Sequence, residues 1–150
     1  MSAALLAALA VLAGTGPAAP AKLVLDPLEV RDAPRPLATL LEQRICQALA
    51  ELQPGVDLVC PEDVAAASTM ARNDAIMGTC QSDACMERVE AMRKAPRKVT
   101  GSLAREGKVL VLTLVLRVDG IAEPRLAKAK LPDDAEAAAA RVPALVRELL

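Results

Sequence analysis

The sequence contains no phenylalanine, tyrosine, tryptophan or histidine. Without aromatic side chains, no ring is present on which a base, a sugar or a flavin could stack. Without histidine, the commonest metal ligand and the usual general base near neutral pH are missing. The sequence therefore predicts no catalytic residue, no metal site and no cofactor, and it favours a protein that is not an enzyme.

The chain also lacks a large net charge of either sign. The 18 Lys and Arg residues almost balance the 19 Asp and Glu residues, which gives a net charge of -1. Nothing in this balance indicates nucleic acid or an anionic membrane as the partner. The 150 residues allow one domain.

The amino-terminal residues 1–21 carry no charged side chain. Their apolar run from Leu5 to Leu12 is shorter than the span of about 20 residues that crosses a bilayer. This pattern is typical of a secretory signal peptide, and Ala19-Pro20-Ala21 fits a cleavage site. We expect a mature domain at 22–150 that is periplasmic or secreted and not membrane-spanning. The run lacks a basic residue before it, which leaves an upstream start codon open, and an Ala/Leu helix packed on the domain is the alternative.

Export changes how the four cysteines are interpreted, because thiols in an oxidising compartment usually pair. Cys80 and Cys85 enclose a short polar loop that a disulfide can close. Cys46 lies about 9 Å back along a helix that ends near residue 52. Cys60 lies about 13 Å along a strand that starts near residue 56, so a second disulfide could join the two elements. The alternative is that Cys46 and Cys60 are small buried side chains.

Cys80 and Cys85 also have a reactive interpretation. Cys85 lies near a predicted helix start, where the helix dipole favours the thiolate. The gap between the two cysteines is longer than the two-residue gap typical of redox dithiols. We therefore expect a structural disulfide, with a thiol-active redox protein as the alternative function.

Hydrophobic periodicity predicts a single-domain α/β sandwich around a mixed sheet, in the order β-α-β-α-α-β-β-β-α. The strand-helix-strand start predicts a parallel crossover, and Pro27 should limit or bend the first strand. Asp133 and Glu136 have the spacing of a capping box for the last helix. The expected elements before the last helix are strands at 22–30, 56–59, 99–104, 109–118 and 124–130, an amphipathic helix at 37–52, a short helix opened by Pro61-Glu62-Asp63, and a helix at 84–94.

The last three strands form an expected antiparallel meander over 98–131. Glu106-Gly107 and Asp119-Gly120 are typical of the hairpin turns that would join them. The run Leu110 to Leu116 is apolar except for Thr113, as in a central strand covered on both faces. Pro124 and the alternating lysines after it predict that 124–130 is an edge strand.

The order of elements, together with particular residues, resembles the amino-terminal domain of TolB and its CsgG- and FlgO-like relatives in bacterial envelopes. The resemblance covers most of 22–150. The residues that carry it are Cys60-Pro61-Glu62-Asp63-Val64, Gly78-Thr79-Cys80-Gln81-Ser82-Asp83-Ala84-Cys85, Val99-Thr100-Gly101-Ser102-Leu103 and Val118-Asp119-Gly120. The chain departs from the pattern at Ala91 to Pro96, where such proteins usually have a Leu-Gly-Ala-type turn, and it lacks their propeller. The resemblance implies a non-catalytic, exported interaction or assembly module of the bacterial cell envelope.

One cluster of charge stands above the background, and it covers residues 88–98. Its positive residues are Arg88, Arg93, Lys94, Arg97 and Lys98, and Glu90 is its negative residue. The plain explanation is a solvated face. The functional explanation is a contact for an acidic partner or for anionic lipid headgroups. We expect an envelope protein partner bound through this basic segment or through the edge strand 124–130, with self-association as a further alternative.

Overall fold

The computed structural model describes residues 21–79 and 82–150, which form one mixed sheet with helices. This arrangement confirms the predicted α/β class. The strands are β1 (Lys22–Leu25), β2 (Glu29–Arg31), β3 (Asp57–Val59), β4 (Arg97–Glu106), β5 (Val109–Val118) and β6 (Arg125–Leu131). The helices are α1 (Arg35–Leu52), α2 (Pro61–Met77), α3 (Ser82–Met92), α4 (Ala135–Ala140) and α5 (Val142–Leu149).

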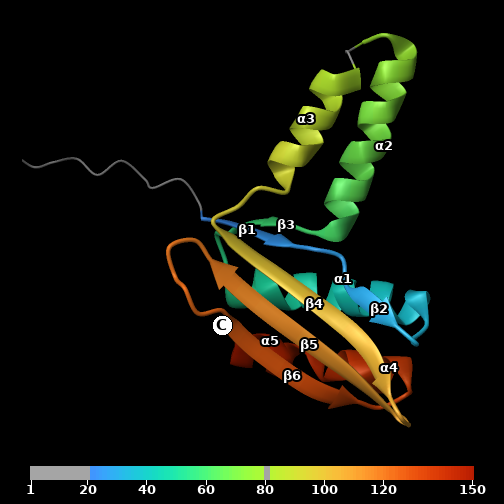
Figure 1. The fold of residues 1–150 in the computed structure, drawn as a ribbon, viewed down its shortest axis with the longest axis vertical. Coiled ribbons are helices and arrows are strands. Elements are labelled where there is room, and N and C mark those ends of the chain that lie inside the picture. The colour runs from blue at the N-terminus through green and yellow to red at the C-terminus, as the bar shows by residue number, and fades with distance from the viewer. Residues whose placement is uncertain (1–20, 80–81) are drawn as a thin grey trace, which may run out of the picture.

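The strands lie in the order β3-β1-β4-β5-β6, and β2 also pairs with β4 (Figure 1). β1 is parallel to β3 and to β4, and β2 is parallel to β4. β4, β5 and β6 pair in antiparallel fashion. The parallel pairing of β1 with β3 across α1, the antiparallel meander and the edge position of β6 are therefore confirmed.

The expected first strand is divided into β1 and β2, both of which pair with β4. Pro27, between them, has no N–H for a ladder bond. The N–H of Leu28 donates instead to Oε1 of Glu42 at 2.8 Å, and the Leu28 side chain is buried. It lies against Gly101, where an added Cβ would approach its Cδ2 to 2.8 Å. The same Cβ would lie 2.8 Å from the backbone oxygen of Thr113, which cannot move as the end of a leucine side chain can, so this close approach favours glycine at position 101.

The expected last helix is also divided, into α4 and α5. Pro143 lies in the first turn of α5, where its missing N–H costs nothing. The cap of α4 is Asp134, whose carboxylate accepts from the N–H of Ala137 at 2.8 Å. The prediction of Asp133 as the cap is wrong by one residue, because Asp133 accepts from Arg105 at 3.0 Å instead.

α1, α4 and α5 cover one face of the sheet (Figure 1). Alternate residues of β5 point into this layer and are buried. On the other face, Val111 is buried, Thr113 and Val115 are half-buried and Arg117 is exposed. The prediction that β5 is covered on both faces therefore holds at Val111 and is wrong for the rest of the strand, because the three helices all lie on one side. The core side chains include Leu110, Leu112 and Leu114 of β5 and Leu41, Ile45 and Leu49 of α1.

α2 and α3 pack on each other and project from the sheet as an arm, residues 61–92 (Figure 1). α2 is longer than the expected short helix and ends at Gly78, which adopts a left-handed conformation with φ of 73°. The root of the arm is joined to α1 by the Cys46–Cys60 disulfide, with a Cα–Cα distance of 6.2 Å. Of the two alternatives that the sequence left open for Cys46 and Cys60, the structure therefore has the disulfide.

Two predictions concern residues that the structure does not describe. The signal peptide at 1–21 lies among these residues except for Ala21, and so does Cys80 with its expected bridge to Cys85. Both stay predictions. Over 21–79 and 82–150, no helix combines the length and the apolar character that crossing a bilayer would need.

Candidate functional site: a basic concavity at the foot of the arm

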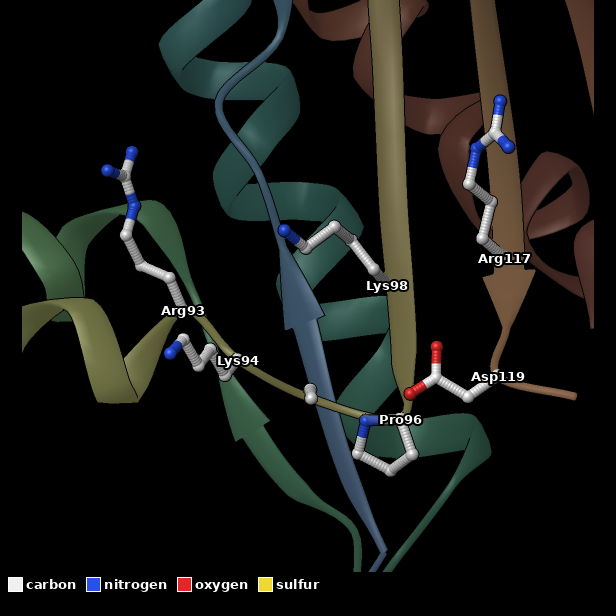
Figure 2. A pocket seen from close by; sticks show the side chains of 7 residues that line it. Arg93, Lys94, Pro96, Lys98, Arg117 and Asp119 are labelled. Carbon is white, nitrogen blue, oxygen red and sulfur yellow. The ribbon is translucent and has the colours of Figure 1, made fainter.

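A concavity of about 690 Å³ opens where the end of the arm meets the sheet (Figure 2). Three parts of the chain line it, and four of the lining side chains are cationic. We call it the basic concavity. Its charged lining is Arg93 and Lys94 after α3, Lys98 in β4, Arg117 in β5 and Asp119 just after β5.

Strand register brings Lys98 and Arg117 together. The two residues are opposite each other in the β4–β5 ladder. Their Cβ atoms therefore lie about 5 Å apart on one face of the sheet, which is unfavourable for like charges unless a counter-charge is supplied. This is the face that α1, α4 and α5 leave uncovered.

The segment between α3 and β4 brings Arg93 and Lys94 to the same place. The N–H of Asp119 donates to the carbonyl oxygen of Pro96 at 2.8 Å, which holds this segment to the end of β5. Nζ of Lys22 donates to the carbonyl oxygen of Ala91 at 3.0 Å, which holds the end of α3 to β1. The position of the arm therefore sets the position of the two cations that follow it.

Positive charge in the basic concavity is only partly compensated. Arg93 lies 3.7 Å from Glu90, and Lys98 lies 3.6 Å from Asp26. Both pairs are partly exposed to solvent and so stabilise the fold little. In the described part of the chain, Lys94 and Arg117 make no ion pair, and Figure 2 shows the Arg117 guanidinium pointing away from Asp119. The concavity thus presents an excess of positive charge to solvent.

The predicted basic segment is divided between three places. Arg93, Lys94 and Lys98 lie together in the concavity, whereas Arg88 lines a groove on the arm. Arg97 points to the opposite face from Lys98, because successive residues of a strand alternate. Its Nε is buried and has no hydrogen-bond partner among the described residues.

Arg117 and Asp119 were not among the predicted site residues. A signal for Arg117 is present in the sequence, because a two-residue turn after Glu106 fixes the register of β4 on β5. That register pairs Lys98 with Arg117. The position of the arm carries no comparable signal, so the contribution of Arg93 and Lys94 to the same concavity follows only from the folded chain.

The other predicted sites that the structure describes, the β6 edge and Cys85 of the cysteine pair, lie outside the basic concavity. β6 presents an exposed edge with Leu126, Lys128 and Lys130 facing solvent. Cys85 is 3% exposed, which opposes the access that a reactive thiol needs. The redox alternative nevertheless stays a prediction, because Cys80 lies outside the described residues. Across residues 21–79 and 82–150, no group of three or more Cys, Asp or Glu could hold a metal ion.

The chemistry of the basic concavity is the binding of an anion. A guanidinium donates two parallel hydrogen bonds to a carboxylate or a phosphate, and an ammonium adds a point charge. Arg93 and Arg117 supply the first kind of group, and Lys94 and Lys98 supply the second.

No protein-family model matches the chain, and no curated protein matches it. The LpoB C-terminal domain from Salmonella enterica is similar in structure, with a TM-score of 0.44 and 15% identity over 75% of this chain and 83% of that chain. A PelC dodecamer from Paraburkholderia phytofirmans has a TM-score of 0.40 and 10% identity over 88% of this chain and 90% of that chain. These scores are too low for either likeness to support a statement about fold or function.

Proposed function

We propose that the chain is a non-catalytic, exported protein-interaction module of the bacterial cell envelope that binds an acidic segment of a partner protein in the basic concavity. The observation that carries the proposal is the presence of Lys94 and Arg117, two cations without an ion-pair partner in the described structure, beside two weakly compensated ones. A bound carboxylate would supply the counter-charge that Lys94 and Arg117 lack.

Two further observations support export and a place in the envelope. The uncharged leader at 1–21 has the pattern of a secretory signal. The Cys46–Cys60 disulfide suits an oxidising compartment, where such bonds persist. The resemblance to the amino-terminal domain of TolB supports the envelope as that compartment.

The test is capture of partners from envelope extracts on the immobilised, oxidised domain 22–150. We expect the parent domain to retain a protein partner at low salt and to release it as ionic strength rises. The double variant Lys94→Glu/Arg117→Glu should lose at least about tenfold in retained partner. Both side chains are exposed, so the variant should keep the melting temperature of the parent.

Two control variants carry the same change of charge. Lys108→Glu/Arg147→Glu alters exposed cations away from the concavity and should retain the partner. Lys128→Glu/Lys130→Glu alters the β6 edge and should also retain it. Equal capture by parent and concavity variant would contradict the proposal, as would loss of capture only in the β6 variant. Binding of the parent to phosphatidylglycerol vesicles but to no protein, lost with Lys94 and Arg117, would replace the protein partner by a lipid.

A further inference from the structure

The arm is a second candidate binding surface, because only a few side chains are buried between its two long helices. The buried side chains between α2 and α3 are Ala71, Cys85 and Val89, with Val64 and Ala67 half-buried beside them. Neither helix packs extensively on another element of the described chain. Most helical stability in proteins comes from the packing of an apolar face, and this pair buries little of one.

Exposed apolar side chains concentrate on the arm. Seven large hydrophobic residues are exposed in the described chain, and four of them lie between residues 61 and 92. Their exposed fractions are 66% for Met70, 83% for Ile76, 78% for Met77 and 39% for Met86. Such a concentration on one projecting element is typical of a surface that another molecule covers.

A groove of about 180 Å³ runs between the two helices. Met70 and Met92 are among its walls, together with the small side chains of Ala67 and Ala71. Methionine is unbranched and adapts its shape to an apolar partner. The groove therefore has the composition of a site that accepts the apolar stripe of a helix.

The charge of the arm defines the kind of helix. Residues 61–92 contain six acidic and two basic side chains. In the groove itself, Asp74 lies on α2 and Arg88 on α3, and neither side chain has a hydrogen-bond or ion-pair partner among the described residues. The acidic excess opposes an anionic lipid surface, since helices that bind such a surface are rich in Lys and Arg. It is complementary to a cationic helix.

We propose that the groove between α2 and α3 binds a cationic amphipathic helix of a partner protein. The apolar stripe of that helix packs against Met70, Met92 and the alanines, and a basic side chain beside the stripe pairs with Asp74. Arg88 is the one cation of the groove and limits how many basic residues the bound helix can place on the side of α3. This surface is separate from the basic concavity and selects a partner of the opposite charge.

The experiment uses the oxidised domain 22–150 and a labelled Leu/Lys peptide of 17 residues, the length of α2, with its leucines on one helical face. A scrambled peptide of the same composition has no apolar stripe and serves as the reference. We expect saturable binding of the striped peptide in fluorescence anisotropy and at least about tenfold weaker binding of the scrambled one. Equal binding of the two peptides would overturn the proposal.

Variants then locate the site. Met70→Glu should weaken binding of the striped peptide at least about tenfold, whereas Leu126→Glu, at a similarly exposed position on β6, should leave it unchanged. Asp74→Lys should weaken binding and Arg88→Glu should strengthen it, so the two changes act in opposite directions. Lys94→Glu/Arg117→Glu should not weaken it, which separates this proposal from the function of the basic concavity.

Three results would overturn the proposal even if the domain folds normally in every variant. The first is a striped peptide that binds the parent and Met70→Glu equally. The second is binding of the parent to phosphatidylglycerol vesicles that Met70→Glu abolishes, which would assign the groove to a membrane. The third is self-association in sedimentation that Met70→Glu abolishes, which would assign the groove to a second copy of the chain.

Discussion

The carboxylate of Glu42 satisfies the backbone at the break between β1 and β2, and its removal should destabilise the whole sheet. Oε1 accepts from the N–H of Leu28 at 2.8 Å and from Nη2 of Arg35 at 3.0 Å. Nη1 of Arg35 donates to the carbonyl oxygen of Leu28 at 2.9 Å, so both backbone groups of Leu28 are satisfied by side chains of α1. The Glu42 side chain is only 8% exposed.

The cost of Glu42→Ala follows from these contacts. The change leaves the buried N–H of Leu28 without an acceptor, which costs about 1–3 kcal/mol, and it removes a charge-assisted bond to Arg35. We expect the free energy of unfolding to fall by about 2–4 kcal/mol in total. Glu42→Gln should cost less, because an amide oxygen in the place of Oε1 still accepts from Leu28 and from Arg35, and the change removes only the negative charge.

The assay is urea unfolding of the oxidised domain followed by circular dichroism. The midpoint for Glu42→Ala should fall by about 1–2 M. The control is Glu51→Ala, which makes the same change at an exposed position of α1 and should shift stability by at most about 0.5 kcal/mol. Equal midpoints for the two variants would refute the reasoning. In a double-mutant cycle, Arg35→Ala and Glu42→Ala should be non-additive by about 1 kcal/mol, since they share the bonds.

Two further perturbations test the packing and the root of the arm. Gly101→Ala should lower the free energy of unfolding by about 1–3 kcal/mol in the same assay, because its Cβ would lie 2.8 Å from the backbone oxygen of Thr113; Ser102→Ala, on the opposite face, is the control, and an unchanged midpoint for Gly101→Ala would contradict the expectation. Replacing Cys46 and Cys60 together by Ala removes a link across a sequence separation of 14 and should cost about 3 kcal/mol, seen as a melting temperature several degrees lower. An unchanged melting temperature would show that the arm root is fixed without the disulfide.

The meander could be predicted closely because its signals are local. Turn residues and strand periodicity define β4 and β5, and the lysines and Pro124 mark β6 as an edge. The division of the first strand could be predicted only in part from the sequence. Pro27 predicts the break, but the burial of Leu28 depends on Glu42, a residue of α1 that lies 14 positions later in the chain. The need for Gly101 also depends on the folded chain, because an added Cβ would meet the backbone oxygen of Thr113 on the neighbouring strand and the side chain of Leu28.

The candidate site was predicted in part for a related physical reason. A run of cations in the sequence is not a patch in space, because a helix, a link and a strand each rotate its members differently. Arg88 therefore lies on the arm and Arg97 on the far side of β4, while Arg117 joins Lys98 from a distant position in the chain. The proximity of Cys46 and Cys60 could be predicted more reliably. A helix and the strand after it each have a fixed rise per residue, so the distances along the two elements place the two cysteines at a similar height.

The net charge of the chain is close to zero, but the opposite charges are concentrated on different surfaces. The arm has six acidic and two basic side chains, whereas the concavity at its foot is lined by four cations and one carboxylate. The Cys46–Cys60 disulfide joins the start of α2 to α1, and Nζ of Lys22 donates to the carbonyl oxygen of Ala91 at the end of α3. The two surfaces adjoin at the end of α3, where Met92 lines the groove, Arg93 lines the concavity and Glu90 lies 3.7 Å from Arg93. A bulk charge of -1 therefore does not indicate a non-specific polyanion binder, but it leaves room for two local contacts of opposite sign.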